Sequence, residues 1–297
     1  MECPVKKRVI FTACSARYVR LFLRMFYPTL RRTGRYEEDV RVVLFGDIEA
    51  GIRTALLRQG LAIEAEWSAN RLNQDWKFEF ARLLHREYEE VYFYDCDIYF
   101  QSDVRPLFRH ARPGRLSVCT EPTIFDRYAM QRRVGFNERN ALRMSAHLPW
   151  PEQERLHAWL TGRAVLNGGF FGGRQLGDLY GALLRFGAGW PRIGFGFDQT
   201  ILNFWAYYFP ETIHRVPKRF ALALCRTPDG LHVGPRGLLM LGRQPAVAVH
   251  VNRHRSPREK LRDPDFARFL EHHPQCRTRR FAQAIAALTP PVFAAEV

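Results

Sequence analysis

The chain has 297 residues, of which 46% are hydrophobic and 25% are charged, and this composition excludes a disordered, collagen-like or coiled-coil protein. Lys and Arg number 45 against 30 Asp and Glu, so the formal net charge is +15. On charge alone the predicted partner is nucleic acid, an anionic lipid surface or a phosphorylated substrate. Residues 1–35 hold nine basic residues and one acidic residue, and residues 252–280 hold nine basic and four acidic residues. A solvated basic surface explains these two clusters as well as a binding face does.

The first half of the sequence alternates short β-branched or aromatic runs with amphipathic patterns. Strands are expected over 9–12, 40–45, 61–67 and 91–94, and helices over 18–26, 52–58 and 76–84. The run 91–94 is apolar on both faces, as a central parallel strand is. This alternation predicts an α/β fold, in which helices cover both faces of a mainly parallel sheet.

The second half is less regular. Strands are expected over 116–120, 164–171 and 247–250, and the polar stretch 125–160 has a helical pattern with little apolar core. Without a Pro- or Ser-rich linker or a repeat, we expect one domain with insertions. Six dispersed cysteines without a CxxC pair indicate reduced thiols, and no signal-peptide pattern or apolar run of ~18 residues is present, so a cytoplasmic protein is predicted.

Two carboxylates, Asp95 and Asp97, follow the apolar run 91–94 directly. Ligands of open α/β sheets bind at the carboxyl ends of strands, where this pair falls. Carboxylate oxygens at a turn can converge on Mg²⁺ or Mn²⁺, which in turn holds a diphosphate. The alternative is a solvated turn, but the buried strand before the pair favours the metal site.

Three later motifs have both a structural and a functional interpretation. Asn167-Gly168-Gly169 brings backbone and an amide close to a sugar, or is a kinked core strand. Asp198-Gln199 opens a helical pattern, where the aspartate is a simple N-cap or a site residue. After the last strand, His250 is a surface histidine or a metal ligand, and the arginines behind it would suit a diphosphate: Arg253, Arg255 and Arg258.

In this order, the Asp-x-Asp, Asn-Gly-Gly, Asp-Gln-x-x-Leu-Asn and strand-end His motifs resemble the retaining nucleotide-sugar glycosyltransferases of the GT-A fold. They are most similar to family 8, which includes glycogenin and the bacterial lipooligosaccharide galactosyltransferases. The stretches 168–173 and 18–26 also resemble family 6, the blood-group transferase type. The resemblance runs from about Val9 to His250 and implies a Rossmann-like nucleotide-diphospho-sugar transferase fold of the GT-A type.

The resemblance implies a role for each motif. Asp95, Asp97 and His250 would bind Mn²⁺ or Mg²⁺ on the donor diphosphate, and Asp198 and Gln199 would form the catalytic pair near the anomeric carbon. The residues implied to bind the donor are Phe11, Thr12, Ala13, Lys77, Glu121, Asn167, Gly168, Arg253 and Arg255.

The sequence departs from those families at three points. Cys14 stands where family 8 often has an acid for the base, which leaves uracil specificity open. The Gly and Lys-Pro-Trp that follow the family 8 histidine are missing after His250, so the phosphate-binding group is open. Gln199 replaces a family 6 glutamate and leaves Asp198 as the only nearby candidate carboxylate, which favours front-face substitution with retention.

We therefore expect a metal-dependent transferase that moves a hexose, from UDP-hexose, to a glycan or glycolipid with retention. Residues 1–120 would be the nucleotide-binding half, 121–260 the acceptor and sugar half, and 261–297 a C-terminal helical tail. The acceptor side is expected within 125–160, with Arg127, Arg132, Arg133, Arg139, Trp150 and Trp159. The basic clusters would allow peripheral contact with an anionic inner membrane face.

Two other classes of function remain open at this point. An Asp-x-Asp phosphotransferase or phosphatase would use Asp95 as its nucleophile, although that motif normally follows the first strand rather than the fourth. A basic nucleic-acid-binding protein would explain the charge, but the sequence has no zinc-finger, RRM or homeodomain pattern.

Overall fold

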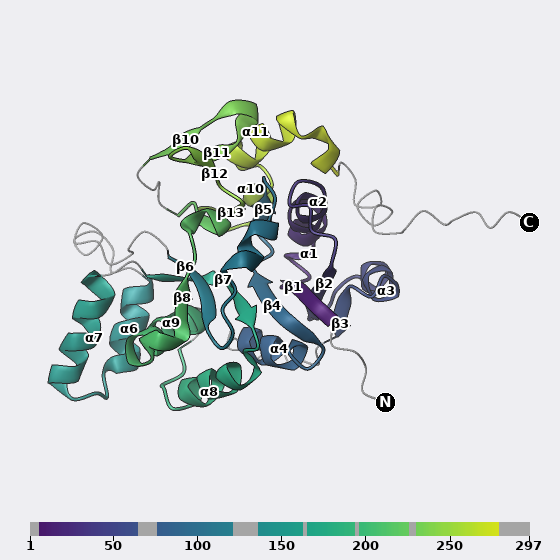
Figure 1. Ribbon diagram of the computed structural model, residues 1–297. Coiled ribbons are helices and arrows are strands. Elements are labelled where there is room, and N and C mark those ends of the chain that lie inside the picture. The colour runs from purple at the N-terminus through teal and green to yellow at the C-terminus, as the bar shows by residue number, and fades with distance from the viewer. Residues whose placement is uncertain are drawn as a thin grey trace, which may run out of the picture.

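The computed structural model describes residues 6–64, 76–120, 136–162, 165–193, 196–225 and 230–278 (Figure 1). A seven-stranded sheet in the order β3-β2-β1-β4-β7-β6-β8 runs through the molecule. Its strands are β1 (Lys6–Ser15), β2 (Asp39–Phe45), β3 (Ala62–Glu64), β4 (Tyr88–Tyr94), β6 (Leu116–Thr120), β7 (Leu166–Arg174) and β8 (Ile213–Arg215).

The pairings make this sheet mainly parallel. β1 pairs parallel with β2 and β4, β2 with β3, and β6 with β8. Only β7 runs the other way, antiparallel to both of its neighbours β4 and β6. The carboxyl ends of β1 and β4 therefore lie at the same edge as the amino end of β7, and this edge carries the site described below.

Helices cover both faces of the sheet, and each face has its own apolar core. One face is covered by a continuous helical segment, α1 (Val19–Leu21), the π-helical η1 (Phe22–Phe26) and α2 (Tyr27–Arg32), and by α3 (Ala50–Arg58). The other face is covered by α4 (Trp76–Leu84), α6 (Phe136–Ser145), α7 (Trp150–Gly162), α8 (Gly177–Ala188) and α9 (Phe197–Tyr208).

Two three-stranded sheets and several short helices complete the described part of the chain. One small sheet orders β5 (Ile98–Phe100), β13 (Ala248–His250) and β9 (Leu222–Ala223), and the other β10 (Leu231–Val233), β11 (Leu239–Leu241) and β12 (Gln244–Pro245). The short helices are η2 (Arg105–His110), η3 (Pro210–Thr212), η4 (Lys218–Phe220), η5 (Pro235–Gly237), α10 (Pro257–Lys260), α11 (Pro264–His272) and η6 (Pro274–Cys276). Pairing of β13 with β5 brings residue 250 beside the end of β4.

The predicted α/β class and the mainly parallel sheet with two helical layers are confirmed. The expected strand over 61–67 is described only as far as Glu64. The expectation of little core in 125–160 is wrong for the described helices α6 and α7, because they bury Ala141, Met144, Leu156 and Leu160. Arg127, Arg132 and Arg133 lie outside the described residues.

Candidate active site

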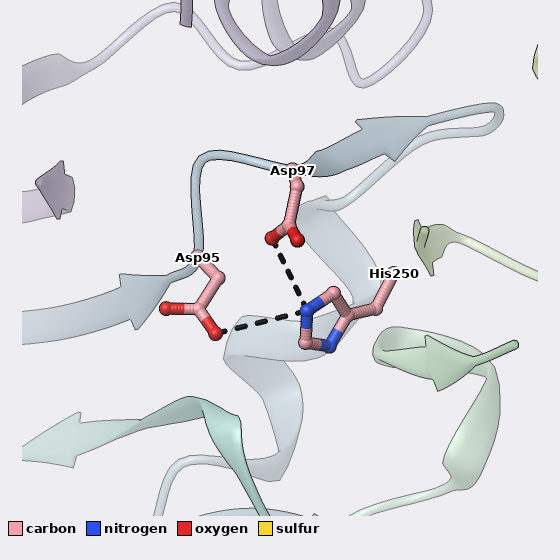
Figure 2. A group of neighbouring side chains, drawn as sticks. All are labelled: Asp95, Asp97 and His250. Carbon is pink, nitrogen blue, oxygen red and sulfur yellow. Dashed lines mark ion pairs between the residues drawn. The ribbon is translucent and has the colours of Figure 1, made fainter. Parts of the chain in front are cut away.

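The turn after β4 brings the two aspartates to one side of the chain. The Asp95 N–H donates to Gly169 O across the sheet at 2.9 Å, and Asp95 O accepts the Ile98 N–H at 3.2 Å to close the turn. Figure 2 shows both carboxylates facing the ring of His250. His250 Nε2 lies 3.1 Å from Asp97 Oδ1 and 3.7 Å from Asp95 Oδ2. The three side chains thus converge from two different sheets.

A lysine on each side neutralises this carboxylate pair. Lys77, on the first turns of α4, lies 3.1 Å from Asp95 Oδ1 and 2.8 Å from Asp198 Oδ2. Lys260 donates to Asp97 Oδ2 and, at 2.8 Å, to Val251 O. Both lysines are more than nine-tenths buried, which is rare for this residue type and requires paired charges.

Lys260 was not singled out from the sequence, although a local signal marks its position. Ser256 accepts the N–H of Glu259, and the Glu259 carboxylate accepts the N–H of Ser256, which is a capping box around Pro257. This capping box starts the one-turn helix α10, and Lys260 at the end of that turn lies against Asp97. Only the tertiary structure shows that its ammonium reaches Asp97.

The charges in this cluster shift one another's proton affinities. Burial alone would raise the pKa of Asp97, but the charges and hydrogen bonds of His250 and Lys260 outweigh it and hold that pKa well below the ordinary value. Burial would likewise lower the pKa of His250, and the facing carboxylates raise it instead. Burial raises the pKa of Asp198, the charge of Asp95 raises it further, and the charge and hydrogen bond of Lys77 offset only part of this rise.

The three convergent groups fit a divalent cation. One oxygen of Asp95, one of Asp97 and one ring nitrogen of His250 lie within 4.8 Å of one another. Two hard carboxylate oxygens with one imidazole nitrogen suit Mn²⁺ and also admit Mg²⁺. The second ring nitrogen, Nδ1, is buried and has no hydrogen-bond partner among the described residues.

Strand β7 passes directly beneath this cluster, and its glycines allow the close approach. A Cβ on Gly169 would lie 2.6 Å from His250 Cε1 and 2.8 Å from Asp95 Oδ2. A Cβ on Gly168 would lie 2.9 Å from Gln199 Cβ. The glycine pair therefore allows the close packing against the site. Residues 166–174 form one strand whose pairing with β6 shifts register between Val118 and Thr120, which agrees with the interpretation of a kinked core strand.

Asn167 is buried between these glycines and the sheet. Its Oδ1 accepts the N–H of Gly169 at 2.6 Å, whereas Nδ2 has no partner among the described residues. An amide N–H₂ that is buried without a partner costs free energy, which a ligand oxygen would recover. Asn167 thus offers a donor at the edge where a sugar is expected.

The Asp198-Gln199 pair lies at the start of α9, and the helix is anchored to β7. Gly196 is the N-cap, with a left-handed φ of 85°, so the interpretation of Asp198 as the cap is wrong. Asn203 Oδ1 accepts the N–H of Leu166, and its Nδ2 donates to Leu166 O and Gln199 O. This side chain holds the first turn of α9 against β7, which fixes Asp198 over Lys77.

In the second half of β1, which continues to Ser15, the three predicted donor residues differ in exposure. Phe11 is fully buried and its ring packs at a tilt against Phe93, with centroids 5.1 Å apart, so its side chain supports the site from the core. Thr12 is buried with an Oγ1 that has no partner among the described residues, and Ala13 is partly exposed. Cys14 is buried and hydrogen-bonds Cys96, which raises the pKa of the Cys96 thiol.

The predicted basic residues after His250 are only partly available. Arg253 donates to both oxygens of Asp263 and to Asp265. Arg255 is exposed, and Glu121 lies outside the described residues. On the expected acceptor side, Trp150 is 67% exposed, Trp159 packs edge-on against Tyr207, and Arg139 is exposed.

Comparison with solved structures now identifies the fold. The galactosyltransferase LgtC in complex with donor and acceptor sugar analogues aligns with a TM-score of 0.55 over 92% of this chain and 98% of LgtC, at 13% identity. An active-site glutamine-to-glutamate mutant of LgtC gives 0.53 over 90% and 95%, at 14% identity. The chain has the GT-A glycosyltransferase fold.

Two further GT-A structures are also similar to this chain. Mouse xyloside xylosyltransferase 1 gives a TM-score of 0.50 over 84% of this chain and 98% of its own, at 15% identity. The bifunctional glycosyltransferase WbbM gives 0.53 over 91% of this chain and half of its own, at 13% identity. No protein-family model and no curated protein matches the sequence. The predicted GT-A fold is thus confirmed at the level of structure.

None of the helices that the structure describes combines the length and the apolar character needed to cross a membrane.

Proposed function

We propose that this protein is a metal-dependent glycosyltransferase that moves a hexose from a nucleotide-diphospho-sugar, UDP-hexose in the first instance, to a glycan or glycolipid with retention of configuration. The observation that carries the proposal is the convergence of Asp95, Asp97 and His250 at the carboxyl end of β4. The GT-A fold supports it, because the similar structures are those of glycosyltransferases.

In this proposal Asp95, Asp97 and His250 hold Mn²⁺ or Mg²⁺, which when bound neutralises charge that grows on the leaving diphosphate. Lys260 and Lys77 flank the same carboxylates from buried positions. We add Lys260 as a candidate for the phosphate-binding role that the sequence left open, and Arg253, which pairs with Asp263 and Asp265, stays a candidate beside it. Exposed Arg255 remains a donor-binding candidate.

The base and sugar lie on either side of the metal in this proposal. The base and ribose would contact the end of β1, at Thr12 and Ala13, over the buried Phe11. The sugar would lie against Asn167 and Gly168, where the Asn167 Nδ2 has no partner among the described residues. Glu121 remains a sugar-pocket candidate from the sequence alone.

The reaction breaks the bond between the anomeric carbon and the diphosphate oxygen and forms a bond from the same carbon to an acceptor hydroxyl. The proton of that hydroxyl goes to the leaving diphosphate on the same face of the sugar, which gives retention. Gln199 orients the sugar and its carbonyl steadies positive charge on the ring. Asp198 is held by Lys77 and stabilises the same charge electrostatically.

The remaining predictions concern the surroundings of this site. The acceptor would enter on the side of α6 and α7, with Arg139, Trp150 and Trp159. The division into a nucleotide-binding half, an acceptor half and a C-terminal tail stays a prediction. So do a cytoplasmic location and peripheral contact of the basic clusters with an anionic membrane, which sedimentation with phosphatidylglycerol vesicles tests against neutral vesicles.

Donor hydrolysis tests the proposal. The protein is incubated with Mn²⁺ or Mg²⁺ and a panel of UDP- and GDP-sugars, and release of the nucleoside diphosphate is measured. We expect turnover of a UDP-hexose that requires the metal and is lost in Asp97→Asn. No turnover of any donor together with no metal-dependent binding of UDP would contradict the proposal. A phosphoenzyme trapped on Asp95 would instead support a phosphotransferase.

A further inference from the structure

The helix after β1 presents a row of arginines beside the proposed donor site. Between residues 19 and 31, a fully described stretch, the side chains that reach the surface are Arg20, Arg24, Tyr27 and Arg31. Spacings of three and four residues put side chains on one face of a helix. The exposed face of the α1–α2 segment is therefore mainly guanidinium.

A second element extends this row. α1 contacts α10, the one-turn helix that carries Arg258 on its exposed side and Lys260 on its buried side. Because Lys260 bonds Asp97, α10 forms the wall between the metal-binding residues and the surface. We define the arginine rim as Arg17, Arg20, Arg24 and Arg258.

The charges of the rim are unmatched in the described part of the chain. None of its four guanidiniums has a carboxylate within ion-pair distance there. The neighbouring acids are used elsewhere: Asp263 and Asp265 pair with Arg253, and Glu259 caps α10. Four unpaired arginines raise the local potential and attract an anion.

The chemistry of the rim favours discrete phosphate groups over insertion into a bilayer. Arginine binds phosphate through two parallel N–H donors, which gives geometric selectivity. A peripheral membrane site normally adds apolar side chains that enter the lipid. The large apolar side chains exposed in the described residues are Leu57, Leu142, Trp150 and Val233, and none of them belongs to α1–α2 or to α10.

We propose that the arginine rim is an acceptor subsite that binds a phosphate group on the saccharide to be glycosylated. This inference rests on the proposed transferase function and adds the class of acceptor, a phosphorylated glycan. Its phosphate would bind beside α10, on the opposite face of the sheet from α6 and α7, while its hydroxyl enters the donor site, so the saccharide would span both sides of the site. The phosphate stays intact and no bond to it is formed or broken.

Binding in the presence of saturating UDP and Mn²⁺ tests the subsite, since the donor's own phosphate positions are then filled. Isothermal titration with glucose 6-phosphate and with glucose gives the affinities. We expect glucose 6-phosphate to bind at least tenfold more tightly than glucose. The double variant R20E/R258E should lose about tenfold of the phosphate-sugar affinity with an unchanged melting temperature, equivalent to about 1.4 kcal/mol.

The matched control is R86E/R185E, which makes the same change of charge at exposed arginines, one after α4 and one on α8, both elements that pack on the other face of the sheet. An equal loss of glucose 6-phosphate affinity in the control would show that the effect comes from net charge alone, and it would overturn the proposal. Displacement of glucose 6-phosphate by UDP and Mn²⁺ would overturn it by assigning the phosphate to the donor site.

A vesicle experiment separates the two sources of phosphate. If R20E/R258E abolishes binding to phosphatidylglycerol vesicles while glucose 6-phosphate never binds, the rim is a lipid surface and the acceptor proposal is overturned. Failure of UDP and Mn²⁺ to bind at all would contradict the proposed transferase function instead. The glucose 6-phosphate titration is then repeated without UDP and Mn²⁺. The proposal still requires R20E/R258E to bind glucose 6-phosphate about tenfold more weakly than the wild type.

Discussion

Two clusters of charged side chains lie at opposite ends of β1 and β4, and they differ in how their charges are matched. At the amino ends, Arg8 lies between Glu90 and Glu38, at 2.7 Å and 2.8 Å, and Lys6 pairs with Asp39 at 2.8 Å. Arg41 also lies 4.0 Å from Asp39, so three basic side chains match three carboxylates. This cluster ties neighbouring strands together.

At the carboxyl ends, three carboxylates share two lysines and a histidine. Lys77 divides its charge between Asp95 and Asp198, and Lys260 and His250 both face Asp97. The carboxylates outnumber the two lysines, the His250 ring lies among them, and the glycines of β7 allow close approach from beneath. The charged residues around one end of β1 and β4 thus tie strands together, and those around the other end are suited to bind a divalent ion.

The strongest test of this contrast removes one carboxylate charge from each end. Asp97→Asn keeps the side chain's shape but removes an anionic ligand, and we expect donor turnover to fall about 10³-fold with loss of Mn²⁺ binding. Glu90→Gln, the matched change at the amino end, should leave turnover within about twofold. The assay is UDP release with titrated Mn²⁺; equal losses in both variants would contradict the contrast.

For the free energy of unfolding, we expect the larger loss from a substitution at the amino-end cluster. Arg8→Met removes the partner of Glu90, whose side chain is only 7% exposed, and leaves a buried unpaired carboxylate. We expect a loss of about 3 kcal/mol in the free energy of unfolding. Urea unfolding measures it, and Mn²⁺ affinity of the folded variant should not change. A stability loss below 1 kcal/mol would mean that the amino-end cluster is not a structural tie.

Gly169→Ala tests whether the metal site depends on the close approach of β7, and it changes no charge. The new Cβ would meet His250 and Asp95 at 2.6–2.8 Å, so these ligands must move. We expect Mn²⁺ affinity to fall 10- to 100-fold, the usual cost of disturbing ligand orientation. In the control Gly181→Ala, the nearest atom to the added Cβ is 3.6 Å away at the end of a flexible arginine. Unchanged affinity in Gly169→Ala would place the metal elsewhere.

The smallest expected effect concerns pH at the amino end. Burial lowers the pKa of His85 from 6.5 to about 4, only partly offset by its hydrogen bond to Tyr88 O. The folded protein therefore binds this proton less readily than the unfolded chain, so the His85 contribution is present above pH 6.5 and is lost as pH falls toward 4. We expect about 2 kcal/mol of such dependence.

Urea unfolding at pH 7 and pH 4.5 checks this prediction in the wild type and in His85→Gln. The variant lacks the titrating ring, so its stability should change less between the two pH values. Parallel curves for the two proteins would show that acid destabilisation comes from other groups.

Several features of the fold were predictable because they rest on local patterns. The alternation of apolar strands and amphipathic helices predicted β1 to β4 and their parallel pairing. The carboxyl-end rule placed Asp95 and Asp97 where ligands bind, and the order of motifs predicted the GT-A fold. The core of α6 and α7 was missed, because their few apolar residues are separated by many charged ones.

Other features depend on contacts between residues far apart in the sequence. The sequence predicts Arg253 as a diphosphate ligand, but it does not show that Arg253 pairs with Asp263 and Asp265 at the start of α11, which the structure adds. Lys260 looked like one of many surface cations, yet it is buried against Asp97, 163 residues away. Neither pairing follows from spacing, because each depends on how residues 248–278 fold over the sheet.

The sequence by itself determined the α/β class, the strand followed by two aspartates and the set of motifs that suggest a sugar-nucleotide site. These features depend on hydrophobic periodicity and short-range geometry, which involve residues close together in the sequence. Only the tertiary structure decided which basic residues belong to that site. Charge and hydrogen-bonding partners are set by three-dimensional neighbours, so the same residue type becomes a buried counterion at Lys260 and a solvated one elsewhere.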